Sequence, residues 1–398
     1  MLNRLLFVTQ NPCAVLARAV TGTLLWLALA ACQTPKGSPE GADAVIGIGV
    51  GAIPGQPGYE EVVRGIDLAI ERLHATAPLR FRTRPPTRNA AGAVQVAQQL
   101  SADPDIVGVV GHPESGGTLE ALPVYADAEH AGANGLVLLS PTASAAQLSG
   151  VSPWFFRVAP SDDDAARVVA RWALDSLRAT RAAIVYRNDA YGREWMSTVA
   201  TAFTKRGAAV VARKPYLAGV TEWDAYAQLL ATLRPDVVFF PGDADDALAL
   251  LRALRANGVT APFVGGDATE QMRQDADARG AYYGTFFRAE QATSAEGRWF
   301  VARYRARFQR DPDSFAALAY DATMVMGRTI VRGARTRAAL RVALEQIGRS
   351  TPAVDGVAGP IAFDRAHDIT GRHVVMVRVD TPADTGKARG AIPDGGAN

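Results

Sequence analysis

The chain has 398 residues, of which 48% are hydrophobic and 21% are charged. This balance is typical of folded globular proteins and excludes a largely disordered chain, and the length is sufficient for two domains of ordinary size. The formal net charge is only +2, so the sequence has no basic footprint and we expect no nucleic-acid partner.

The N-terminal region predicts export and a lipid anchor. An apolar run over residues 23–31 is too short to span a membrane and is typical of the core of a signal peptide. The sequence LAAC, which ends at Cys32, resembles a bacterial lipobox, so residues 1–31 are predicted to be removed and Cys32 to carry lipid. An uncleaved anchor or an ordinary signal peptide is the alternative. Residues 32–43 are predicted to form a flexible tether between the membrane and the folded body.

From residue 45 onward, short β-rich runs alternate with helical stretches. The candidate strands are 45–50, 79–84, 106–110, 136–139, 182–186, 209–215, 236–240, 262–265 and 283–287. Amphipathic stretches such as 59–75, 91–100 and 247–257 lie between them. This alternation predicts an α/β fold in which mostly parallel sheets are covered by helices on both faces. Capping boxes over 161–164 and 221–224 predict helix starts, and Asn257-Gly258 predicts a helix end.

The chain thus divides into two βα halves and a C-terminal segment. One half runs from about 44 to 158 and the other from about 161 to 287. The C-terminal segment is predicted to form helices at 295–308, 315–331 and 338–347 and strands at 360–363 and 374–379. A tail over 381–398, rich in Gly, Pro, Ala and Asp, is predicted to be disordered.

Two strand-to-helix turns carry polar side chains. The first, here called the first clamp turn (residues 112–118), follows the strand at 106–110 and contains Ser115. The second clamp turn (residues 140–146) follows the strand at 136–139 and contains Thr142 and Ser144. Helix starts carry unpaired N–H groups and partial positive charge, which favour small anions. Two such turns on nearby strands can therefore hold one carboxylate.

Polar side chains also follow strands of the second half. Asp267 comes after a Val-Gly-Gly strand exit, where it can contact a ligand or cap a helix at 268–274. Asp243 follows another strand, where it can likewise contact a ligand or cap a helix. Tyr191 lies at a third strand exit, where an aromatic ring either covers a ligand or packs locally.

Signatures of catalysis and cofactor binding are scarce. The run from Gly47 to Ala52 fits a dinucleotide fingerprint, but Pro54 and Pro57 separate it from the next helix, so we expect no cofactor. The chain has no H-E-x-x-H motif, no P-loop and no G-x-S-x-G motif, and its five histidines show no metal-ligand spacing. We therefore expect neither a metal site nor an enzyme.

Five motifs, in order and spacing, resemble the type I periplasmic binding proteins, in the branch of the leucine/isoleucine/valine-binding protein of ABC transporters. They are VVGHPESGGT, LLSPTASAAQL, SPWFFRVAPSDDDAARVVARW, VYRNDAYGREW and GVAGPIAFDRAHD. The similarity runs from about residue 44 to 379. It implies two Rossmann-like lobes with mostly parallel sheets, joined by a three-strand hinge near 159–161, 287–292 and 364–370. The first lobe is then 44–160 plus 290–364, and the second is 161–289 plus 365–380.

The resemblance also implies roles for individual residues. In relatives that bind amino acids, hydroxyl and backbone N–H groups of the first-lobe turns hold the ligand carboxylate, and a second-lobe acid helps to hold the ammonium. The positions that match the carboxylate-binding groups are Ser115, Thr142, Ala143 and Ser144. Asp267 matches the acid, Tyr191 matches an aromatic that closes over the ligand, and Tyr59 matches a first-lobe aromatic.

Two acids depart from the family pattern. Asp243 stands where relatives often have a tyrosine, and Glu114 adds an acid near the first clamp turn. If these side chains face the cleft, they favour a polar or cationic ligand over a simple aliphatic amino acid.

The function implied by the resemblance is that of a solute-binding protein anchored by lipid in the periplasm or at the cell surface. It would capture a small amino acid or related carboxylate by hinge closure, with an ABC permease as its partner. The alternative is a ligand sensor, or a lipoprotein that activates cell-wall synthesis enzymes, on the same fold. A neighbouring permease and ATPase gene pair favours transport, whereas an exposed apolar patch away from the cleft favours a partner role.

Overall fold

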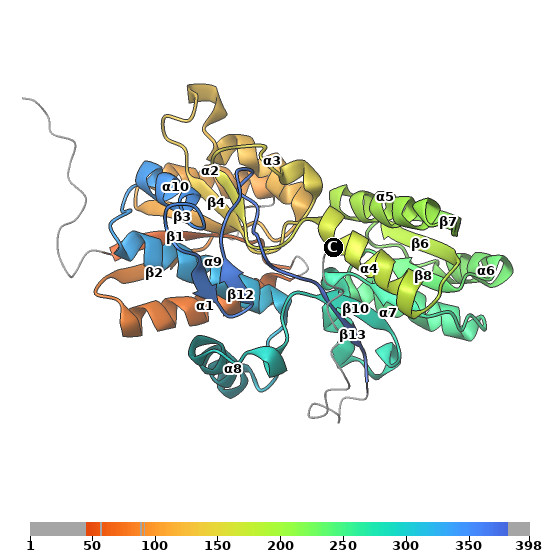
Figure 1. Ribbon diagram of the computed structural model, residues 1–398. Helices are drawn as coiled ribbons and strands as arrows, with labels where there is room; N and C mark the ends of the chain where they lie inside the picture. The colour runs from red at the N-terminus through yellow and green to blue at the C-terminus, as the bar shows by residue number, and fades with distance from the viewer. Residues whose placement is uncertain (1–44, 56–57, 88–89, 91, 381–398) are drawn as a thin grey trace, which may run out of the picture. The chain divides into compact units, whose positions relative to one another are not determined.

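The computed structural model describes residues 45–55, 58–87, 90 and 92–380 (Figure 1). The predicted signal peptide, the lipid site at Cys32, the tether and the C-terminal tail lie outside these residues. Within the described part of the chain, no helix combines the length and the apolar character that crossing a membrane requires.

The first sheet has five parallel strands in the order β2-β1-β3-β4-β5. These strands are β1 (Val45–Gly51), β2 (Arg80–Arg84), β3 (Ile106–Gly111), β4 (Val137–Ser140) and β5 (Phe155–Arg157). Every residue of the last three is buried, as expected when helices cover both faces of a sheet. The part of the chain built on this sheet is here called the first lobe. Its first helices are α1 (Tyr59–Thr76), α2 (Ala93–Ala102) and α3 (Ser115–Tyr125).

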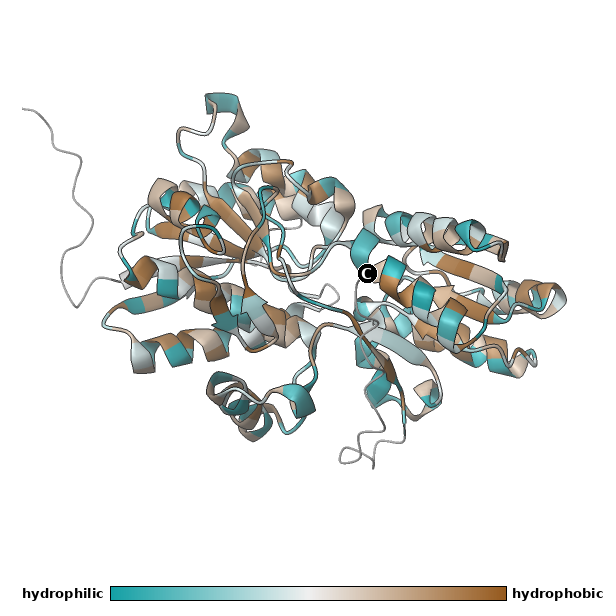
Figure 2. Ribbon diagram, viewed as in Figure 1, coloured by the Kyte–Doolittle hydropathy of each residue, from teal (hydrophilic) through white to brown (hydrophobic). Residues whose placement is uncertain are grey.

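The second sheet has six strands in the order β13-β10-β9-β8-β6-β7, of which only the edge strand β13 is antiparallel. The strands are β6 (Arg181–Arg187), β7 (Ala209–Tyr216), β8 (Val237–Phe240), β9 (Phe263–Gly265), β10 (Tyr282–Thr285) and β13 (Val375–Arg378). The part of the chain built on this sheet is here called the second lobe. Its helices are α4 (Asp162–Ser176), α5 (Ala190–Lys205), α6 (Trp223–Leu233) and α7 (Ala244–Ala256). Apolar residues gather on the strands of both sheets (Figure 2). The predicted α/β class with mostly parallel sheets is confirmed.

The C-terminal segment returns to the first sheet before it reaches the second. It forms α8 (Ala295–Phe308), α9 (Ser314–Val331), α10 (Arg337–Glu345), β11 (Val354–Gly356) and β12 (Gly359–Ile361). Helix α9 packs closely on α1. Gly65 makes this close packing possible, because a Cβ atom at that position would lie 2.2 Å from the Ala316 carbonyl oxygen. The chain therefore passes between the sheets three times, at 158–161, 286–294 and 362–374.

Buried arginines tie the third of these crossings to the first lobe. Arg157, fully buried in β5, donates from Nε and Nη2 to the two carboxylate oxygens of Asp368, at 2.6 and 2.9 Å. Arg372 donates to Asp321 of α9 and to the Val158 carbonyl, both at 2.8 Å. Arg157 thus joins the third crossing to β5, and Arg372 joins it to α9 and to the first crossing.

Two of the three predicted helix-end signals are confirmed. The Ser161 hydroxyl accepts the Asp164 N–H at the start of α4, and α7 ends at Ala256 with Asn257 as its C-cap, before Gly258 with a φ of 73°. The predicted capping box over 221–224 is wrong, because α6 begins at Trp223 without a side-chain cap bond. Trp223 packs against the aromatic rings of β7 and β8, so tertiary packing fixes where this helix begins.

Candidate functional site

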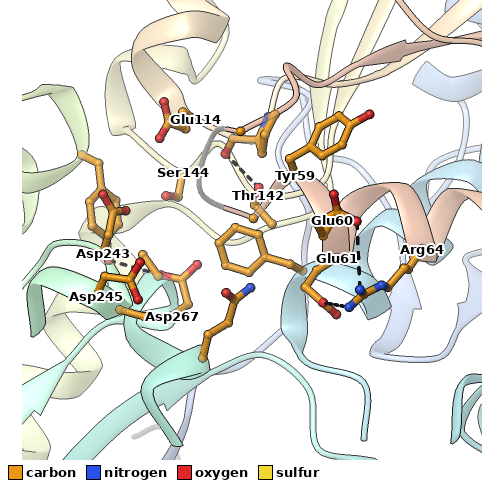
Figure 3. A pocket seen from close by; sticks show the side chains of 18 of the residues that line it. Tyr59, Glu60, Glu61, Arg64, Glu114, Thr142, Ser144, Asp243, Asp245 and Asp267 are labelled. Carbon is orange, nitrogen blue, oxygen red and sulfur yellow. Dashed lines mark hydrogen bonds and ion pairs between the residues drawn. The ribbon is translucent and has the colours of Figure 1, made fainter. Parts of the chain in front are cut away.

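A cavity of about 690 Å³ is lined by residues of both lobes (Figure 3). Most of its lining segments follow β1, β3 and β4 of the first sheet and β6, β8 and β9 of the second, so it lies at the carboxyl ends of six strands. Open α/β sheets bind ligands at this edge, and the volume lies in the range of small-molecule sites. The sequence-predicted residues that line it are Tyr59, Ser115, Thr142, Ser144, Tyr191, Asp243 and Asp267.

The two clamp turns are joined to each other by hydroxyl groups. The Ser115 hydroxyl accepts the backbone N–H groups of Ser144 and Ala145, each at 3.1 Å. The Thr142 hydroxyl donates to the Pro113 carbonyl at 2.8 Å. These uncharged bonds hold the two turns against each other, so Ser115, Thr142 and Ser144 form a neutral, hydroxyl-lined wall of the cavity.

Ala143 is the one predicted ligand-binding residue that the structure does not bring to the cavity. It is fully buried, and its N–H donates to the Ser140 hydroxyl at 2.9 Å. The sequence also predicted free N–H groups in this turn, whereas those of Ala143 and Ser144 are bonded to serine hydroxyls. A ligand carboxylate must therefore share or displace the Ser115 hydroxyl to reach the Ser144 N–H.

We expect Ser115→Ala to destabilise the protein by about 1–3 kcal/mol, since two buried N–H groups lose their acceptor. Urea unfolding measures this loss, and ligand affinity should fall with it. The matched control is Ser101→Ala, because the buried Ser101 hydroxyl has no hydrogen-bond partner among the described residues. Equal stability of the two variants would contradict the structural role of Ser115.

Asp267 supplies a buried carboxylate from the second lobe. Only 5% of the residue is exposed, and the Tyr191 hydroxyl donates to its Oδ1 at 3.4 Å. Burial raises the pKa of Asp267 to about 6. The predicted helix at 268–274 is a 3-10 helix over Asp267–Gln274 with Gly266 at its N-cap position, so a capping role for Asp267 is wrong. Gly266 lets the Tyr191 ring approach, since a Cβ atom there would lie 2.3 Å from the hydroxyl oxygen.

Asp162 lies close to this acid, and from the sequence it was predicted only as part of a capping box. It is fully buried, its Oδ1 accepts the Trp195 indole N–H at 2.8 Å, and its backbone N–H donates to the Ser144 carbonyl at 2.7 Å. Burial, and then the charge of Asp267, raise the pKa of Asp162 well above its usual value. The second clamp turn is therefore in contact with an acid at the start of α4.

Arg187, at the end of β6, was also not singled out from the sequence. Its guanidinium pairs with Asp189 and Asp243, and its Nη1 lies 3.6 Å from Glu114 of the first lobe. Burial disfavours the charged guanidinium, but the surrounding acids raise the pKa of Arg187. Asp243 makes no side-chain cap bond to α7, so its carboxylate is turned to Arg187 and not to the helix. The sequence signal that could have identified Arg187 is a basic residue directly after the predicted strand at 182–186.

The opposite end of the cavity combines aromatic side chains with balanced charges. Tyr59, Phe308 and Phe315 supply the aromatic surface. Glu61 is buried and pairs with both Arg64 and Arg310. Figure 3 shows the α1 side chains on the side of Thr142 that faces away from Asp243.

The residues of the site do not suit a metal ion. Within the described ranges, no group of three or more His, Cys, Asp or Glu side chains is placed to hold one. His112 of the first clamp turn does not line the cavity, and its Nε2 lies 3.1 Å from the Tyr125 hydroxyl. Burial lowers the pKa of His112 to about 4, so the ring is neutral at pH 7 and has a structural role.

Known proteins resemble this chain in sequence and in fold. The family model described as periplasmic binding protein matches residues 54–387. An amino acid binding protein of Pseudomonas aeruginosa is 27% identical over 220 residues, which span 54% of this chain and only 57% of that protein. Two solved structures share the fold. A leucine binding protein of Thermotoga maritima has a TM-score of 0.76 and 20% identity, and the match covers 84% of this chain and 95% of that chain. A solute binding protein of R. palustris in complex with benzoate has a TM-score of 0.74 and 17% identity, and the match covers 85% of this chain and 94% of that chain. The chain therefore belongs to the periplasmic binding protein family, in the type I branch that its motifs predicted, and is a binding protein rather than an enzyme.

Proposed function

We propose that this protein captures a small amino acid or related carboxylate between its lobes and releases it unchanged, as the binding component of an ABC importer. The observation that carries the proposal is a cavity with hydroxyl-rich turns of one lobe on one wall and the buried carboxylate of Asp267 on the other. This ligand class is supported by similar proteins that are named for binding amino acids or leucine, or that were solved in complex with benzoate.

In this proposal the ligand first contacts the first lobe. The turns that carry Ser115, Thr142 and Ser144 hold its carboxylate, and hinge closure brings Asp267 and Tyr191 to its ammonium group. Hydrogen bonds to charged groups contribute about 1.5–3 kcal/mol each. A micromolar complex needs about 8 kcal/mol, so four or five such bonds leave a margin that offsets desolvation and closure.

A thermal-shift screen of free amino acids, amino acid amides and small carboxylates tests the proposal. A bound ligand raises the melting temperature by mass action, and calorimetry then gives its affinity. We expect an α-amino acid to be bound more tightly than its amide, because the amide lacks the carboxylate that the clamp turns hold. Turnover of any probe by the purified protein, or a melting temperature that no probe raises, would contradict it.

We further propose that Cys32 carries lipid and places the folded body in the periplasm or at the cell surface. The Cys32→Ala variant should leave the membrane fraction and appear in the soluble extracytoplasmic fraction, because it lacks the thiol to which the lipid would be attached. Cys13→Ala is the matched control and should remain with the membrane. Continued membrane association of the Cys32 variant would rule out the lipid anchor.

A further inference from the structure

The charges around the cavity are unevenly distributed. Its lining contains six carboxylates and three guanidinium groups. At the α1 end, Glu60 and Glu61 face Arg64 and Arg310, so that end is formally neutral. The excess of negative charge therefore lies at the other end.

Among the described residues that line that other end, Arg187 is the single cation beside several acids. Glu114, Asp243 and Asp245 line the cavity there, and Asp189 pairs with the same guanidinium. With Asp267 left aside for the α-ammonium group of the ligand, these four carboxylates and one guanidinium give a formal charge of −3. The N-termini of α3, α5 and α7 offset about half a charge each, so a charge of about −1.5 remains without a counterion.

Two of these acids do not cap the helices that they precede. Glu114 and Asp243 both occupy N-cap positions, yet neither side chain makes a cap hydrogen bond. Both share the Nη1 atom of Arg187, which leaves each carboxylate with further acceptor capacity toward the cavity. They are 29% and 20% exposed, and burial raises the pKa of each, so their charges are partly desolvated and only partly compensated.

From this arrangement we infer that the ligand carries a second cationic group, held between Glu114 and Asp243 beside Arg187. The ligand class is an α-amino acid with an amine or guanidinium at the end of its side chain. This inference rests on the proposed function, which assigns the α-carboxylate to the clamp turns and the α-ammonium to Asp267. Glu114 belongs to the first lobe and Asp243 to the second, so closure encloses the distal cation between acids of both lobes.

An aliphatic or anionic ligand suits this end of the cavity poorly. A branched hydrocarbon side chain would desolvate Glu114 and Asp243 without supplying a counterion, and a benzoate-like ligand would bring no cation at all. A distal amine or guanidinium instead donates charge-assisted hydrogen bonds to both carboxylates.

Calorimetry with L-lysine, L-arginine, L-leucine and benzoate tests the inference. Wild-type protein should bind L-lysine or L-arginine more tightly than L-leucine and benzoate. The double variant Glu114→Gln/Asp243→Asn should bind the cationic amino acids roughly 10- to 100-fold more weakly, since each loses a hydrogen-bonded charge partner. L-leucine should bind this variant at least as tightly as wild type. Glu120→Gln, on the exposed face of α3, is the matched control and should leave the selectivity unchanged.

The outcomes separate this inference from the function on which it rests. If L-leucine or benzoate is preferred by the wild type, or if the double variant weakens all probes equally, the distal cation site is overturned. If L-leucine binds in an Asp267-dependent way and the cationic amino acids do not, the inference fails and the proposed function stands. If no amino acid or carboxylate binds at all, both fail.

Discussion

Asp267→Asn should stabilise the ligand-free protein at pH 8 and weaken ligand binding roughly 10- to 100-fold. The loss of affinity follows because the asparagine amide is neutral and cannot compensate the ligand ammonium. The gain in stability follows because the carboxylate is 5% exposed and charged at pH 8 at a cost that the amide does not have. A variant that gains stability and loses function identifies a residue retained for binding.

The pH dependence of this effect has a definite sign. Burial raises the pKa of Asp267 from 3.8 to about 6 in the folded protein. The stabilising contribution of protonation is complete below about pH 4 and is lost as the pH rises through 6. A shift of this size corresponds to about 3 kcal/mol, which is the upper limit of the stability gained by the asparagine variant at pH 8.

Urea unfolding at pH 4 and pH 8, together with calorimetry, measures both effects. The stability difference between variant and wild type should be large at pH 8 and nearly vanish at pH 4. Asp236→Asn is a control of opposite sign, since hydrogen bonds from Thr180 lower the pKa of Asp236 and its loss should destabilise the protein. An Asp267 variant that is less stable at pH 8 and binds ligand normally would remove this residue from the site.

Arg157→Met should destabilise the protein by about 3–5 kcal/mol, the usual effect of breaking a buried ion pair by removing one partner. The fully buried guanidinium bonds to Asp368 and to the Ser149 hydroxyl, and it donates to the carbonyls of Ser144 and Ala145 at 2.8 and 3.0 Å. Methionine fills much of the same space but replaces none of these donors. Ligand affinity should also fall, because two carbonyls of the second clamp turn lose their anchor.

Urea unfolding of this variant needs a control that removes an arginine without a buried network. Arg206→Met serves, since Arg206 pairs with Asp175 on the surface and both side chains are about half exposed. Its effect should stay within about 0.5 kcal/mol. Similar losses in the two variants would show that the buried contacts of Arg157 contribute little to stability.

Most of the fold could be predicted from the sequence because its strands and helices have the ordinary lengths and periods. The helix over Ala295–Phe308 has the predicted bounds, and the parallel strands follow from apolar runs between turns. The strands Phe155–Arg157 and Val354–Gly356 were missed, since three residues are too few to show a period. Such short strands exist only because neighbouring strands supply their hydrogen bonds.

The site was less predictable than the fold, because its geometry depends on contacts between distant segments. Strand exits correctly pointed to residues that line the cavity, such as Ser115 and Asp267. The serine hydroxyls that occupy the turn N–H groups could not be foreseen, since Ser115 reaches Ser144 across 29 positions of sequence. The partner of Asp243 was likewise hidden, because Arg187 lies 56 positions away.

The uncharged bonds between the two clamp turns have a consequence for how ionic strength acts on recognition. Mobile ions screen full charges over a Debye length of about 8 Å at 0.15 M salt, whereas fixed dipoles within bonding distance are hardly affected. Added salt should therefore weaken binding at the Arg187 end of a captured molecule and leave the hydroxyl-lined wall almost unchanged. The slope of affinity against salt concentration thus reports how much of the recognition depends on formal charge.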